Sequence, residues 1–234
     1  IVSQDTKRYY PDNNFLAQVL GRVDADGIGQ GGIEREYNVE LSGLPGMRIS
    51  EVARNSSGIP YSNSEFAKPV DGKDVTLTVD ETIQYFAEKV AEEGKKEYKA
   101  DGVSIIVMNP KNGEILAMAN KPDYNPNEPY KGYENFPGKD KTEAVSNSFE
   151  PGSIFKMVTS SAAVQEGIAG GNETYFCPGG KNVSGTYIKC WKPEGHGTET
   201  FDQILENSCN VGFMDIGQKL GKEKLNEYIE KFGF

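Results

Sequence analysis

Two polar residues one helical turn apart carry the strongest catalytic signal in this sequence. The segment FEPGSIFK over residues 149–156 contains Ser153 and ends at Lys156. Its Pro-Gly pair predicts a tight turn that opens a helix at Ser153. Because residues three apart on a helix are neighbours, Lys156 can reach the serine hydroxyl. A lysine whose pKa is lowered can take the proton of that hydroxyl, so the pair predicts a serine nucleophile with a lysine general base.

S-x-x-K alone also fits a helix-capping serine followed by a solvated lysine. A second element, Ser208-Cys209-Asn210, follows later in the chain between two predicted helices. In such an element a serine hydroxyl can relay a proton, and an asparagine amide can orient the lysine or a substrate amide. Together the two elements favour acyl transfer, with Ser208 and Asn210 assisting the Ser153–Lys156 pair.

The three cysteines and the single histidine all fall within residues 177–209, in the order Cys177, Cys190, His196, Cys209. Three thiolates and one imidazole make a complete tetrahedral set for zinc, and a metal would order this Gly- and Pro-rich stretch. Such a zinc would be structural, and it would hold the residue between Ser208 and Asn210. Two alternatives stay open, which are a Cys177–Cys190 disulfide with Cys209 free, and three reduced thiols.

Hydrophobic periodicity and turn signals indicate the elements that position these residues. Residues 75–79 predict a strand, and Asp80 predicts the N-cap of a helix over 81–98. An Asn-Gly turn between two apolar runs predicts a hairpin. The remaining expectations are hairpin strands at 103–108 and 115–119, a loop over 120–147, a Gly-rich stretch before 199, and helices over 153–165, 201–207, 211–219 and 222–231.

Composition and charge narrow the class of protein. The chain has 234 residues, and its 35 acidic and 25 basic side chains give a net charge of −10, which argues against a nucleic-acid partner. No apolar run approaches the ~20 residues of a membrane span, and no signal peptide is visible. Because Ile1 is not a start methionine, we expect an N-terminal anchor, if the protein has one, to lie outside this chain. Residues 1–72 predict short strands and loops, with turns at 56–60 and 68–72 leading to a domain boundary.

The motifs resemble those of class B penicillin-binding proteins, the D,D-transpeptidases of cell-wall synthesis. Residues 145–156 are similar to the family's nucleophile segment, and residues 206–210 are similar to its second motif. The family's N-terminal pedestal, or dimerisation, domain is similar to residues 8–11, 19–21 and 32–37. Cys190-Trp191 with Gly195-His196-Gly197 resembles the sporulation-specific and related Gram-positive branch. The middle residue of the second motif is Cys209 instead of aspartate, which is a permitted S-x-N form. The departure from the family is the absence of a K-[ST]-G motif.

The resemblance implies an α+β fold. It implies part of a β-rich pedestal domain over 1–72, then the N-terminal portion of a transpeptidase domain over 73–234, with helices packed on an antiparallel sheet. The strand that carries K-[ST]-G comes later in the family, so we expect these 234 residues alone to be inactive.

The resemblance also implies substrate and partners. Ser153 would attack the D-Ala-D-Ala end of a peptidoglycan stem peptide, and β-lactams would acylate the same residue. A membrane-embedded glycan polymerase would be the partner, at the extracytoplasmic face of the cell membrane. The alternatives are a β-lactamase or β-lactam sensor, which would have no reason to keep residues 1–72, and a non-catalytic cell-wall scaffold.

Overall fold

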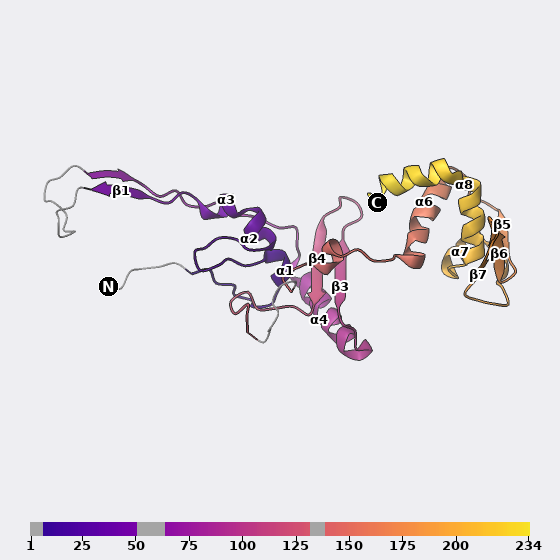
Figure 1. The fold of residues 1–234 in the computed structure, drawn as a ribbon, viewed down its shortest axis with the longest axis horizontal. Helices are drawn as coiled ribbons and strands as arrows, with labels where there is room; N and C mark the ends of the chain where they lie inside the picture. Colours follow the sequence, from indigo (N-terminus) through magenta and orange to yellow (C-terminus); the bar gives the residue numbers. More distant parts are fainter. Residues whose placement is uncertain (1–6, 51–63, 132–138) are drawn as a thin grey trace. The chain divides into compact units, whose positions relative to one another are not determined.

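A computed structural model describes residues 7–50, 64–131 and 139–234 (Figure 1). The turn predicted at 56–60 lies outside these residues. The chain divides into two compact units, Ile1–Asn147 and Ser148–Phe234. The predicted domain boundary between residues 72 and 73 stays a prediction. All the predicted catalytic and metal-binding residues belong to the second unit.

The beginning of the first unit holds short helices as well as strands. An antiparallel pair of strands follows the helices. The sequence interpretation missed the helices because each has only four or five residues, which is too short to display a 3.6-residue period. The elements are α1 (Ala17–Leu20), α2 (Gly32–Glu36), α3 (Asn38–Ser42), β1 (Met47–Ser50) and β2 (Ser64–Ala67).

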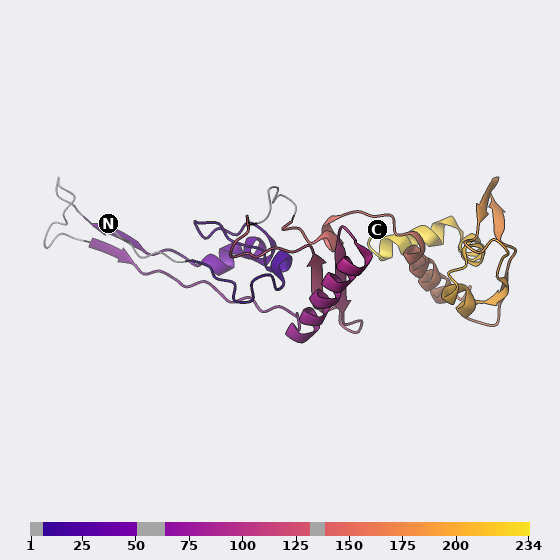
Figure 2. The same ribbon diagram turned by 90° about the horizontal axis from the view of Figure 1, so that it is seen from below.

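The next part of the first unit is one helix packed on a hairpin. Helix α4 (Glu81–Tyr98) begins where the Asp80 side chain accepts a hydrogen bond from the Ile83 N–H at 2.9 Å, as predicted. It lies across one face of the antiparallel hairpin of β3 (Val103–Met108) and β4 (Ile115–Lys121) (Figures 1 and 2). Small side chains let the helix approach the sheet closely. The buried alanines are Ala87, Ala91, Ala117 and Ala119.

Two expectations for the first unit need correction. Residues 75–79 form no strand. They are held to the start of β4 by isolated bonds, in which Thr78 Oγ1 donates to the Ile115 carbonyl at 2.7 Å and the Asp80 N–H donates to the Leu116 carbonyl at 2.9 Å. The predicted loop over 120–147 contains a short helix, α5 (Glu143–Ser146).

The second unit combines helices with short strands. A 3₁₀ turn, η1 (Gly152–Phe155), leads directly into α6 (Lys156–Gln165), and α6 packs against α8. The Gly-rich stretch before residue 199, to which the sequence assigned no helix or strand, forms two antiparallel pairs of strands. β5 pairs with β8, and β6 pairs with β7. The elements are β5 (Thr174–Cys177), β6 (Gly180–Val183), β7 (Thr186–Lys189), β8 (Gly197–Thr200), α7 (Phe201–Glu206) and α8 (Asn210–Lys231).

Two local backbone features account for the β6–β7 hairpin and for the interruption of α8. Ser184 and Gly185 join β6 to β7 with positive φ angles of 49° and 87°, which is the backbone of a tight two-residue hairpin turn. The helices predicted over 211–219 and 222–231 form α8, which is interrupted at Gly221 (φ 75°, ψ 168°). None of the helices in the described ranges is long and apolar enough to cross a membrane.

The core of the second unit joins its helices to its strands. Ile204 of α7 and Ile216 of α8 are completely buried, together with Ala162 of α6. Cys177, Cys190 and Cys209 belong to the same buried cluster. The thiols and the start of α8 are therefore fixed by the packing that holds the unit together.

Candidate active site

Ser153 lies in the 3₁₀ turn that precedes α6. Gly152 has a φ of 54°, which an L side chain rarely adopts and which lets the chain turn sharply into η1. Ser153 is exposed, and Lys156 follows three residues later as the first residue of α6. Residues three apart lie on one side of a 3₁₀ turn. The Lys156 backbone N–H donates to the Ser153 carbonyl. Among the described residues, no hydrogen bond joins the Ser153 hydroxyl to the Lys156 ammonium, so the predicted side-chain contact is not made in this state.

The Lys156 ammonium instead binds the second motif. Its Nζ donates to the Ser208 carbonyl at 2.7 Å, to Ser208 Oγ at 3.0 Å and to Asn210 Oδ1 at 2.7 Å. The Phe213 ring lies beneath the ammonium, with its centroid 5.3 Å from Nζ. The structure thus brings the two sequence motifs together through one side chain.

The surroundings of Lys156 change its proton affinity. Burial lowers the pKa of its ammonium, and the thiols of Cys190 and Cys209 act in the opposite direction. The net effect is a pKa below the ordinary value of 10.5. A lower pKa increases the neutral fraction of the amine at a given pH, and only the neutral amine can accept a proton.

Ser208 has a backbone conformation that suits these bonds. Its φ is 48°, in the left-handed region that residues with a Cβ adopt rarely. Its N–H donates to the Leu205 carbonyl at 3.1 Å, at the end of α7. In this conformation both its carbonyl and its hydroxyl face Lys156.

Asn210 is held at both ends of its amide. Its Nδ2 donates to the Lys189 carbonyl at 3.2 Å, while its Oδ1 accepts from Lys156. The two bonds determine which amide atom faces the lysine. Asn210 is also the first residue of α8, so the helix start determines its place.

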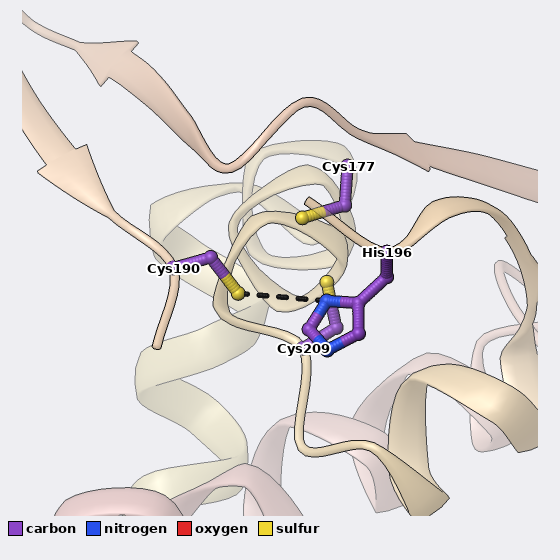
Figure 3. A group of neighbouring side chains, drawn as sticks. All are labelled: Cys177, Cys190, His196 and Cys209. Atoms are coloured by element: carbon purple, nitrogen blue, oxygen red, sulfur yellow. Dashed lines mark hydrogen bonds between the residues drawn. The ribbon is translucent and has the colours of Figure 1, made fainter. Parts of the chain in front are cut away.

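The four predicted metal ligands converge beside this motif (Figure 3). One ligand atom from each of Cys177, Cys190, His196 and Cys209 lies within 4.8 Å of the others. Cys190 Sγ and His196 Nδ1 are 3.7 Å apart. Four coordinating atoms around zinc with Zn–S bonds of about 2.3 Å lie ~3.8 Å from one another, so the donors match the metal in type and need only a small contraction.

Close backbone contacts make this convergence possible. Cys177 ends β5 and His196 immediately precedes β8. Gly195 has a φ of 80°, and a Cβ there would lie 2.1 Å from the Cys177 carbonyl oxygen. Cys209 is the N-cap of α8, where its Sγ accepts from the Gly212 N–H at 3.5 Å. All three cysteines are free thiols in the structure.

The thiols differ in acidity. Burial raises the pKa of Cys190, but hydrogen bonds from the backbone N–H groups of Lys192 and Asn210 and from the Cys177 thiol, with a smaller one from the Val211 N–H, bring the pKa below the ordinary value. For Cys209, burial dominates and raises the pKa. A thiolate is the form that binds a metal, so Cys190 is the more readily deprotonated ligand of these two.

Sequence reasoning missed three residues that connect the cluster to Ser208. Trp191 Nε1 donates to the Asn207 carbonyl at 2.8 Å, and Asn207 Nδ2 donates to Glu199 Oε1 at 2.7 Å. Glu199 is buried, with Oε2 3.8 Å from His196 Nδ1. Asn207 directly precedes Ser208, and this neighbouring position is a sequence signal for a role at the site. No pattern in the sequence points to Glu199.

Comparisons with known proteins agree with the geometry. Residues 103–234 match the penicillin binding protein transpeptidase domain, and residues 1–77 match the penicillin-binding protein dimerisation domain. Stage V sporulation protein D of Bacillus subtilis is 36% identical over 100% of this chain and 36% of its own length. A probable peptidoglycan D,D-transpeptidase of Pseudomonas aeruginosa, PbpC, is 34% identical over 99% of this chain and 40% of its own.

A solved structure is also similar. The crystal structure of penicillin binding protein 3 of Mycobacterium tuberculosis complexed with ampicillin has a TM-score of 0.80 and 30% identity, over 97% of this chain and 46% of its own. The present chain spans between a third and a half of the length of these relatives. With a transpeptidase-domain match over more than half of its residues, and both motifs joined at Lys156, the chain belongs to the penicillin-binding protein family.

Proposed function

We propose that the protein of which this chain is a part is a serine D,D-transpeptidase that cross-links peptidoglycan stem peptides. The observation that carries the proposal is the triple hydrogen bond from Lys156 to Ser208 and Asn210, one turn after the exposed Ser153. This arrangement places a base of lowered pKa three residues after a candidate hydroxyl nucleophile. The family membership supports the same chemistry.

In the first half-reaction Ser153 attacks the carbonyl carbon between the two terminal D-alanines, and neutral Lys156 takes the hydroxyl proton. The Ser153 N–H supplies one donor to the developing oxyanion. When the carbon–nitrogen bond breaks, the proton returns through the Ser208 hydroxyl to the leaving amine of D-alanine. In the second half-reaction, the amine of a neighbouring stem attacks the acyl-enzyme carbonyl and loses a proton to Lys156. The bond from that carbon to Ser153 Oγ then breaks, and the proton passes from Lys156 to Oγ, which restores the free serine.

Fluorescent-penicillin labelling of the full-length protein tests this function. We expect stable covalent labelling of the wild type and none of Ser153→Ala. Ser161→Ala is a matched control because Ser161 is an exposed serine of α6, and it should label normally. A penicilloyl adduct on the Ser153→Ala variant, read by intact-mass spectrometry, would refute the assignment.

The same experiment separates the alternatives. A β-lactamase would release the label within one rapid turnover, and a non-catalytic scaffold would take up no label. Residues 1–77 match a dimerisation domain, which supports the transpeptidase over a free β-lactamase.

We infer further that Cys177, Cys190, His196 and Cys209 bind one structural zinc ion. The proximity of the four donors and the lowered pKa of Cys190 support this. With four protein ligands the site is closed, so the metal would stabilise the segment from β5 to the start of α8 and would not activate water.

Metal analysis of the purified full-length protein tests the zinc. We expect about one equivalent of zinc, less metal in Cys177→Ser, and a lower melting temperature after chelation, because a metal bound to the native state stabilises it by mass action. Absence of metal together with a mass 2 Da below the fully reduced value would establish a disulfide and overturn the zinc proposal.

We also propose that the complete protein acts at the extracytoplasmic face of the cell membrane with a glycan polymerase as partner. Family membership supports this location because peptidoglycan is cross-linked outside the membrane. Protease digestion of intact spheroplasts checks the location, since an extracytoplasmic domain would be degraded. Co-purification after in-cell cross-linking checks the partner, and recovery of no polymerase would count against it.

A further inference from the structure

Three residues outside the predicted site form a connected group next to Ser208, which we call the Asn207 clamp: Trp191, Glu199 and Asn207. The indole of Trp191 donates to the Asn207 carbonyl at 2.8 Å, and the Asn207 amide donates to Glu199 Oε1 at 2.7 Å. Asn207 is therefore held through its backbone on one side and through its side chain on the other.

The burial of Glu199 makes its bond to Asn207 significant. Glu199 is 3% exposed, and its second oxygen, Oε2, is buried without a hydrogen-bond partner among the described residues. A buried carboxylate is costly unless donors satisfy it, and a hydrogen bond gains strength in surroundings of low polarity. The carboxylate therefore holds the Asn207 amide firmly at the end of α7.

Asn207 influences the backbone conformation of Ser208, the next residue. Its carbonyl belongs to the peptide group that includes the Ser208 N–H, so fixing this carbonyl fixes the orientation of that group. Ser208 must keep its left-handed φ of 48° to turn its carbonyl and hydroxyl to Lys156. A residue in that region stays there only when its surroundings hold it. Lys156 holds Ser208 from one side and the clamp holds it from the other.

We propose that Asn207 is a positioning residue, which sets the Ser208 hydroxyl for proton relay through the hydrogen bonds of Trp191 and Glu199. The clamp also connects Ser208 to the thiol cluster, because Trp191 follows Cys190 and Glu199 lies against His196. The kinetic consequence rests on the proposed acyl transfer, whereas the structural consequence does not.

The kinetic test compares variants of the full-length protein in fluorescent-penicillin acylation. Asn207→Ala should lower the acylation rate constant by about 10- to 100-fold, with the dissociation constant of the non-covalent complex unchanged, because only the relay is misplaced. Trp191→Phe keeps an aromatic ring but loses the indole N–H donor, so it should lower the acylation rate constant less than Asn207→Ala does. Glu199→Gln keeps an acceptor for the Asn207 amide and should be near wild type, whereas Glu199→Ala should not.

Controls separate positioning from loss of structure. Asp202→Ala changes an exposed side chain of α7 outside the second motif and should leave acylation unchanged. Melting temperature and metal content are measured for each variant. Equal acylation rate constants for wild type, Asn207→Ala and Trp191→Phe would overturn the proposal.

Hydrogen exchange gives a readout that is independent of the chemistry. Exchange of the amides over residues 205–212, followed by mass spectrometry, should be faster in Asn207→Ala than in wild type or Asp202→Ala. If the wild type were not acylated at all, the proposed function would fail, yet this exchange difference would still support the clamp. Unchanged exchange would overturn the clamp whatever the labelling result.

Discussion

Lys156 Nζ lies 2.7 Å from Asn210 Oδ1, although 54 positions separate the two residues in the chain. This bond joins the start of α6 to the start of α8, so the packing of one helix on the other determines the geometry of the base. The strength of the base and the stability of the second unit therefore depend on the same contacts.

The first prediction concerns the lysine as a base. Lys156→Arg keeps the positive charge but cannot lose a proton at ordinary pH, so acylation should fall by about 100- to 10,000-fold. Lys192→Arg makes the same change at an exposed lysine of the same unit and should acylate normally. Stopped-flow acylation of the full-length protein measures both, and near-normal acylation of the Lys156 variant would exclude lysine as the base.

The second prediction is a pH dependence. Since burial lowers the pKa of Lys156, and the reactive form is neutral, the acylation rate should rise with pH and reach its midpoint below pH 10.5. Asn210→Asp adds a carboxylate beside the ammonium, which favours the charged form and should move the midpoint to higher pH. Rate–pH profiles of the two proteins check the sign, and a shift to lower pH would contradict it.

The third prediction uses the left-handed backbone of Ser208. Ser208→Ala and Ser208→Gly both remove the hydroxyl, but only glycine adopts a φ of 48° without a Cβ penalty. The glycine variant should be more stable than the alanine variant by roughly 0.5 to 1 kcal/mol.

The same pair of substitutions at Ser161, inside α6, is the control. There alanine should be more stable than glycine by about 1 kcal/mol. Denaturant unfolding of the four variants measures the comparison, and the same order at both positions would show that Ser208 is not strained.

The fourth prediction concerns two glycines of α8. A Cβ at Gly212 would lie 2.6 Å from Ile204 Cδ1, so Gly212→Ala should cost about 1 to 3 kcal/mol of unfolding free energy. A Cβ at Gly217 would meet nothing within 4 Å, so Gly217→Ala should stabilise the helix by roughly 0.5 to 1 kcal/mol. Equal effects in thermal unfolding would mean that α7 and α8 are less closely packed than described.

Sequence patterns predicted the parts of this structure that have a local cause. Asp80 caps α4, and Asn112-Gly113 lies in the β3–β4 turn, because both signals act over a few residues. The convergence of Cys177 with Cys209 was also expected, because the zinc interpretation requires the three thiols and the imidazole to meet. The roles of these residues stay predictions.

The features that the sequence did not predict depend on distant contacts. The four strands between Thr174 and Thr200 have too few residues for a period to emerge, and their pairing depends on positive φ angles at turns such as Ser184. The bond between Asn207 and Glu199 depends on how β8 meets α7. The lysine was expected to face Ser153, but the acceptors that it binds belong to Ser208 and Asn210.

The sulfur of Cys209 has two contacts of different kinds. It accepts a hydrogen bond at the start of α8, and it lies close to the other two thiols and the His196 imidazole. A chelator or a soft electrophile that reached this sulfur would loosen the helix start that carries Asn210. Such a compound would inhibit acylation without reacting with Ser153 and without containing a lactam ring. Enzymes that destroy β-lactam antibiotics would have no bond in it to hydrolyse, so inhibition should persist unchanged when a β-lactamase is added to the assay.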